Sequence, residues 1–121
     1  MSILEGGLLV ATVLCVIANG YEVAAKAVKA EAVLKNSGEV GLAPRWLPYL
    51  AVIEGAGVVG LVIGLAGVKV LGLAAAIGLV VFFVVAIAVH IRARVLYNIA
   101  FPAVFLALAV GSVAYFALPG V

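Results

Sequence analysis

The segment VLGLAAAIGLVVFFVVAIAV, from Val70 to Val89, contains no charged or strongly polar side chain. A helix of about 20 residues rises ~30 Å, which matches the thickness of the hydrocarbon core of a bilayer. Lys69 precedes the stretch, and His90 and Arg92 follow it, so polar side chains mark both of its ends. The sequence therefore predicts a transmembrane helix over residues 70–90.

Three further apolar stretches have similar length, at about residues 3–20, 46–66 and 96–118. The first could continue as helix to about Leu34, because the segment after Tyr21 is rich in Ala, Glu and Lys and has no Gly or Pro before Lys35. It lacks a basic N-terminal region, so it is not expected to be a cleaved signal peptide.

Composition agrees with an integral membrane protein. Hydrophobic residues make up 69% of the 121-residue chain and charged residues 10%, with a mean hydropathy of +1.45. Soluble domains are roughly half apolar and a quarter charged. Residues 1–121 are therefore expected to form a single transmembrane domain with no soluble domain.

Short connections between four spans predict an all-α, up-down-up-down four-helix bundle with left-handed packing. Gly57, Gly60 and Gly64 share one face of the second span. Because helices in lipid associate through close backbone approach, this face is expected to contact a neighbouring helix.

The positions of the basic residues predict the orientation. Lys69 is the one basic residue near the second connection. The other six lie in or next to the first and third connections: Lys26, Lys29, Lys35, Arg45, Arg92 and Arg94. The positive-inside rule then predicts a multi-pass protein of the inner (plasma) membrane with both termini outside.

Glu54 is the strongest candidate for a functional residue, because it lies within the second span. Inserting a charged side chain into the middle of a membrane span costs ~2.5 to 3.5 kcal/mol. Burial disfavours its charged form, so it is either protonated or held ionised by a cation or several donors. His90, whose side chain ordinarily changes charge near neutral pH, ends the third span on an interior row. We interpret Glu54 and His90 as candidate catalytic acid–base groups; the alternative for Glu54 is a carboxylic acid that only fixes helix packing.

Four more polar residues are candidates for substrate binding: Asn19, Glu22, Arg92 and Asn98. Asn19 and Glu22 continue the interior face of the first helix. Arg92 follows His90, although it could equally be a cation that reaches out to lipid headgroups. Pro102 lacks the N–H that would bond the Asn98 carbonyl, which predicts a free backbone acceptor near the start of the fourth span.

The order of several short motifs resembles the DoxX-like family of small four-helix membrane proteins over about Val13 to Leu118. The matching pieces are Lys26 or Lys29, RWLP at 45–48, EG at 54–55, the glycines at 57, 60 and 64, Gly72, Ala74 to Ala76, Gly78, and HIR at 90–92. Relatives named for a thiosulfate:quinone oxidoreductase subunit imply redox work at the membrane, and a bound quinone as a possible cofactor. The chain itself has no cofactor-binding motif.

The first functional hypothesis is a membrane protein that binds a lipophilic small molecule, quinone-like or terpenoid- or sterol-like, with acid–base chemistry such as isomerisation, hydrolysis or a redox-associated step. The alternatives are a small proton-coupled exporter and a non-catalytic accessory subunit of a membrane complex; a homodimer is also possible. Cys15 and His90 are the single residues of their kinds, so no metal site is expected. A net charge of +2 gives no support for nucleic-acid binding.

Overall fold

The computed structural model describes residues 1–121 and contains only helices. The elements are α1 (Ile3–Ala27), α2 (Glu31–Glu39), a single 3₁₀ turn (Pro44–Trp46), α3 (Leu47–Leu65), α4 (Lys69–Arg92) and α5 (Ala100–Ala117). The four long helices are each apolar enough to cross a membrane. The all-α membrane bundle predicted from the sequence is confirmed.

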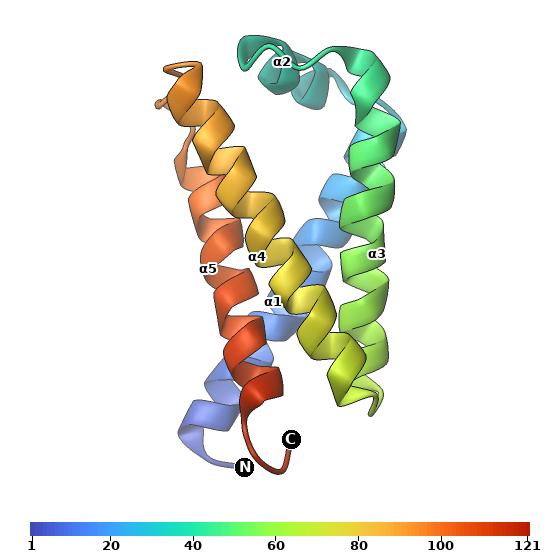
Figure 1. Cartoon of the computed structure of the whole chain (residues 1–121), viewed down its shortest axis with the longest axis vertical. Helices are drawn as coiled ribbons and strands as arrows, with labels where there is room; N and C mark the ends of the chain where they lie inside the picture. The colour runs from blue at the N-terminus through green and yellow to red at the C-terminus, as the bar shows by residue number, and fades with distance from the viewer.

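The four long helices form a ring in which α3 and α5 each pack against both α1 and α4 (Figure 1). Both chain termini lie at one end of the bundle, together with the turn between α3 and α4 (Figure 1). We call this the terminal end. Helix α2 and the connection between α4 and α5 lie at the opposite end, which we call the α2 end. Successive long helices therefore run up, down, up and down.

Glycines bring α3 and α4 into close contact near the terminal end. A Cβ atom on Gly64 would lie 2.4 Å from the Cα of Gly72, and one on Gly60 would lie 2.5 Å from the Cβ of Ala75. These distances leave no room for a side chain, so the predicted packing face of α3 is confirmed. Toward the α2 end the two helices diverge (Figure 1).

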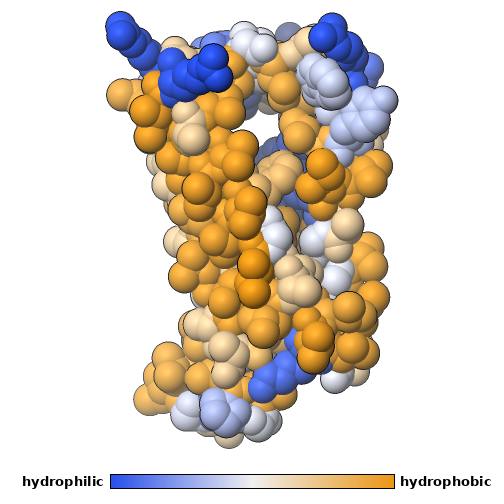
Figure 2. Space-filling view, viewed as in Figure 1, coloured by the Kyte–Doolittle hydropathy of each residue, from blue (hydrophilic) through white to orange (hydrophobic).

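Most large side chains of the bundle face outward, and Figure 2 shows an apolar surface along the length of the helices with hydrophilic residues concentrated at the two ends. The buried core is small: Cys15, Leu61, Ala76, Leu79, Phe83, Ala109 and Phe116. Such a surface is stable in lipid, where exposed apolar side chains carry no hydration penalty.

The prediction that the first helix continues to Leu34 is wrong. Helix α1 ends at Ala27, and Lys29 adopts a left-handed conformation with φ of 50°. The Ala30 N–H donates to the Ala25 carbonyl at 2.9 Å, which closes the turn and separates α2 from α1. A left-handed lysine ends the helix here without the glycine that usually marks such a position.

The fourth span begins later than predicted. Residues 97–99 form a turn, in which the Ile99 N–H donates to the Leu96 carbonyl at 3.3 Å, and α5 starts at Ala100 rather than near residue 96. Pro102 is then the third residue of α5. The first turn of a helix has no partners for its N–H groups, so a proline there causes no kink.

Candidate functional site

A buried ion pair joins α1 to α3. The Lys26 ammonium donates to Glu54 Oε1 at 2.8 Å, and the Glu54 side chain is fully buried whereas the Lys26 side chain is 14% exposed. A short charge-assisted hydrogen bond of this kind offsets part of the cost of removing both charges from water. Lys26 is therefore the cation that the sequence required for an ionised Glu54.

Lys26 ends a polar row that faces the interior along α1. Residues at spacings of three and four lie on one face of a helix, and here they are Thr12, Cys15, Asn19, Glu22 and Lys26. Thr12, Cys15 and Asn19 are fully buried, as the sequence predicted for Asn19. Glu22 lies at the edge of the row, 34% exposed, with Oε2 at 3.5 Å from the Lys26 ammonium.

Two buried side-chain oxygen atoms, one on α3 and one on α1, have no hydrogen-bond partner. They are Glu54 Oε2 and Asn19 Oδ1, and both are buried. The Asn19 amide nitrogen donates to the Cys15 carbonyl at 2.8 Å, which fixes the amide orientation. A buried acceptor without a donor costs free energy, so both oxygens are suited to a bound group that supplies donors.

Above the ion pair the bundle is open. Lys26 is the second-to-last residue of α1, so α1 ends beside the ion pair. Helix α3 extends about two helical turns, or ~10 Å, beyond Glu54 toward the α2 end. Helix α4 continues ~15 Å beyond the Phe82 ring, whose centroid lies 6.0 Å from the Lys26 ammonium. Figure 2 shows the resulting hollow between the upper parts of α3 and α4, directly below α2.

Two grooves adjoin this region. A groove of about 490 Å³ at the α2 end is lined by Val40, Gly41, Leu42, Val89, Arg92 and Ala93. A second groove, of about 350 Å³, lies between α3 and α4 and is lined by Ile53, Ala56, Gly57, Ala74, Ala75, Gly78, Leu79 and Phe82. Phe82 lines the second groove and also lies near Lys26, whereas Lys26 and Glu54 themselves line neither groove.

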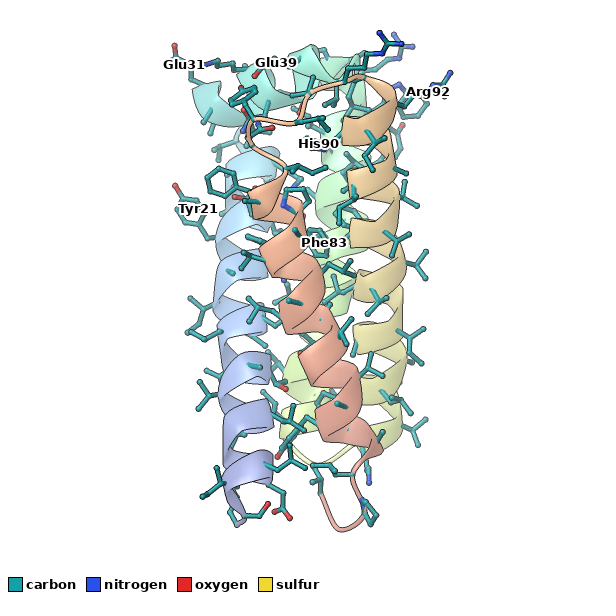
Figure 3. The ribbon with its side chains drawn as sticks, turned by 90° about the vertical axis from the view of Figure 1, so that its left-hand side faces the viewer. Tyr21, Glu31, Glu39, Phe83, His90 and Arg92 are labelled. Carbon is teal, nitrogen blue, oxygen red and sulfur yellow. The ribbon has the colours of Figure 1, made fainter.

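His90 and Arg92 lie nearer the α2 end than the ion pair does. Figure 3 shows His90 beyond Phe83 on the side of α2, with Arg92 at the end of α4. His90 Nδ1 lies 2.9 Å from the Ala86 carbonyl oxygen, and eight residues separate His90 from Phe82, or ~12 Å along the helix. The structure therefore does not join His90 or the exposed Arg92 to Glu54 by a hydrogen bond.

Asn98 precedes α5 at the same end of the bundle. Its backbone carbonyl accepts from the Phe101 N–H at 3.2 Å, so the prediction of a free carbonyl is wrong. An i to i+3 bond in the first turn replaces the one that Pro102 cannot make. The side-chain atom Asn98 Oδ1 is nevertheless buried without a partner.

A hydrogen bond ties α2 to the connection between α4 and α5. The Tyr97 hydroxyl donates to Glu39 Oε1 at 2.6 Å, between residues 58 apart in the chain. The bond to the Glu39 carboxylate raises the pKa of the Tyr97 phenol above its ordinary value of 10.0. This contact fixes α2 to the connection that precedes α5.

Sequence reasoning missed the role of Lys26, which entered only as a topology signal and as a family motif. Following the interior row of α1 from Asn19 by three residues and then by four leads to it, and this spacing was the available signal. The described residues contain no group of three His, Cys, Asp or Glu side chains that could hold a metal ion.

Comparison with known proteins identifies the family. The chain matches no curated protein and no solved structure. The DoxX-like family matches residues 10–112, which include the ion pair, the polar row from Thr12 to Lys26 and both His90 and Asn98. The chain therefore belongs to the DoxX-like family.

Proposed function

We propose that this DoxX-like protein binds a lipophilic small molecule, quinone-like or terpenoid- or sterol-like, beside the Lys26–Glu54 ion pair. One observation carries the proposal. Glu54 is fully buried in a membrane bundle, and Lys26 holds one of its oxygens while the other has no partner. Intramembrane ionisable groups are costly and usually mark functional sites. The hollow below α2 (Figure 2) is the space proposed for such a molecule, because neither of the two grooves is lined by Lys26 or Glu54.

The ion pair is suited to acid–base chemistry. Glu54 is the base that accepts a proton from the ligand, and Lys26 stabilises negative charge that develops on a ligand oxygen. His90, between the pair and the α2 end (Figure 3), is the group assigned to exchange the proton with water. Asn98 orients the ligand through its unpaired amide oxygen. Isomerisation, hydrolysis and a redox-associated proton transfer can each use a base beside a cation.

The proposed location is the inner membrane, with the α2 end in the cytoplasm and both termini outside. Six of the seven basic residues lie in helices or connections at the α2 end, and Lys69 is at the terminal end. The positive-inside rule supports this orientation.

The test is to extract the protein gently and measure the mass of any molecule that stays bound. We expect the wild type to carry a lipophilic small molecule and Glu54→Gln to lose it by at least about tenfold, since a hydrogen bond to a charged group is worth that much. Glu5→Gln is the matched control, because Glu5 belongs to the opposite end of α1. Wild-type retention of the ligand by both Glu54→Gln and His90→Ala would overturn the proposal.

A further inference from the structure

The groove at the α2 end combines an apolar lining with one cation. Its volume is about 490 Å³, and it lies between the connection that follows α2 and the end of α4. The lining residues are Val40, Gly41, Leu42, Val89, Arg92 and Ala93. Arg92 is the one charged residue among them, and the other five are aliphatic residues or glycine. The groove is therefore suited to a molecule that has both an anionic part and an apolar part.

The Arg92 guanidinium has no anionic partner within the chain. Both ion pairs of the structure belong to Lys26, and Arg92 is exposed. Glu39 directly precedes Val40, but its carboxylate accepts from the Tyr97 hydroxyl and does not line the groove. A guanidinium has five N–H donors and can bind a phosphate through two parallel hydrogen bonds. Arg92 is therefore available to bind an anion from outside the chain.

The position of Arg92 along α4 indicates the kind of anion. Helix α4 has 24 residues and rises ~36 Å, which exceeds the ~30 Å hydrocarbon core of a bilayer. Arg92 ends this helix (Figure 3), so it lies at the level of the lipid headgroups. Val89 lies three residues earlier on the same face, nearer the middle of the membrane. A phospholipid presents its phosphate and its acyl chains at these two levels.

We infer that this groove binds one anionic phospholipid from the leaflet on the side of α2, with its phosphate on Arg92 and the upper part of an acyl chain against Val89 and Leu42. The positive charge favours a lipid with a net negative headgroup, such as phosphatidylglycerol, over zwitterionic phosphatidylcholine. The juxtaposition of an unpaired arginine with an aliphatic groove at headgroup level carries this inference. The site is separate from that of the proposed function, because neither Lys26 nor Glu54 lines the groove.

The experiment is native mass spectrometry of the full chain in a neutral detergent, which counts the lipids that stay bound. The chain is titrated with phosphatidylglycerol or with phosphatidylcholine of the same acyl composition. We expect a single phosphatidylglycerol per chain, bound at least about tenfold more tightly than phosphatidylcholine. Equal affinities for the two lipids would overturn the inference. This comparison uses the wild type, so it does not depend on the folding of any variant.

A pair of arginine variants tests the position of the lipid. Arg92→Gln should weaken phosphatidylglycerol binding by about tenfold or more, because the charged hydrogen bonds to the phosphate are lost. Arg94→Gln is the matched control, since it removes the same charge from the same end of the molecule but Arg94 does not line the groove. It should bind phosphatidylglycerol as the wild type does. Equal losses in the two variants would show that only the overall positive charge attracts the lipid, and would refute the site.

Inorganic phosphate distinguishes a lipid site from a site for a small anion. An excess of phosphate should leave phosphatidylglycerol bound, because phosphate makes no contact with the aliphatic lining. Displacement of the lipid by phosphate would overturn the inference. The molecule of the proposed function depends on Glu54 and the phospholipid depends on Arg92, so each proposal can fail without the other.

Discussion

At the scale of single residues, the central feature is a buried ion pair, in which each charge would be costly to place in the membrane without the other. Glu54 is fully enclosed, and Lys26 is exposed for only 14% of its side chain. Removing one partner of a buried pair leaves the other charge uncompensated, whereas removing both leaves a neutral interior. The two residues should therefore depend on each other for the stability of the bundle.

A double-mutant cycle tests this dependence. Lys26→Met and Glu54→Gln should each lower the free energy of unfolding by about 3–5 kcal/mol, and the double variant should lose much less than the sum. The measurement is unfolding by denaturant in micelles. Glu22→Gln serves as the control and should cost less than about 1 kcal/mol, because Glu22 is 34% exposed and 3.5 Å from Lys26. Strictly additive losses would show that the two charges are not coupled.

The sequence was sufficient to single out Glu54 but not its partner. A carboxylate inside a span needs compensation, and this follows from hydropathy alone. The identity of the partner depends on how α1 and α3 pack, because Lys26 and Glu54 are 28 residues apart in the chain. The same limitation applies to Glu54 and His90, whose separation along the bundle depends on the relative heights of α3 and α4.

At the scale of elements, the break between α1 and α2 creates the space above the ion pair. A continuous first helix would have extended beyond its contacts with α3 and α5 into the region near the α2 end. The break could not be predicted, since Lys29 adopts a left-handed backbone in a segment without Gly or Pro. The glycine face of α3, in contrast, was predictable because spacing alone places Gly57, Gly60 and Gly64 together.

The contact between Tyr97 and Glu39 predicts a pH dependence for the position of α2. The carboxylate stabilises the neutral phenol, so the folded-state pKa of Tyr97 lies above its ordinary value of 10.0. The stabilising contribution is therefore complete below the ordinary pKa and is lost as the pH rises through the raised pKa.

The ultraviolet absorbance of tyrosinate, taken as the difference between the wild type and Tyr97→Phe, measures this titration. Glu39→Gln should return the midpoint to about 10, the value for an unperturbed tyrosine. An unchanged midpoint in that variant would show that the hydrogen bond does not persist in the membrane.

At the scale of the whole molecule, the bundle is closed at one end and open at the other. Contacts between Gly64 and Gly72 bring α3 and α4 together near the terminal end, and the same helices separate beneath α2. A membrane bundle of four antiparallel helices was predictable from four apolar spans and short connections. The asymmetry between the two ends could not be predicted in this way. It depends on how far α1 extends toward the α2 end relative to α3.

The orientation of the molecule yields a direct prediction. With six basic residues in elements at the α2 end, both termini should lie outside the cytoplasm. Alkaline phosphatase fused to the C-terminus should be active, and green fluorescent protein fused at the same place should stay dark. The opposite pattern would place the α2 end outside. Lys69→Gln removes the one basic side chain at the terminal end. It should leave the result unchanged, since Lys69 opposes this orientation.

The depth of the Lys26–Glu54 pair has a consequence for its response to voltage. The pair lies ~10 Å below the start of α3, about a third of the way across a ~30 Å hydrocarbon core. A full crossing of the membrane field is worth ~2.3 kcal/mol per elementary charge per 100 mV. A proton that reaches the pair from the α2 end therefore traverses only about a third of that drop, or ~0.8 kcal/mol per 100 mV. Occupancy of this site by protons should consequently respond to 100 mV of membrane potential about as much as to 0.6 of a pH unit in the adjacent compartment.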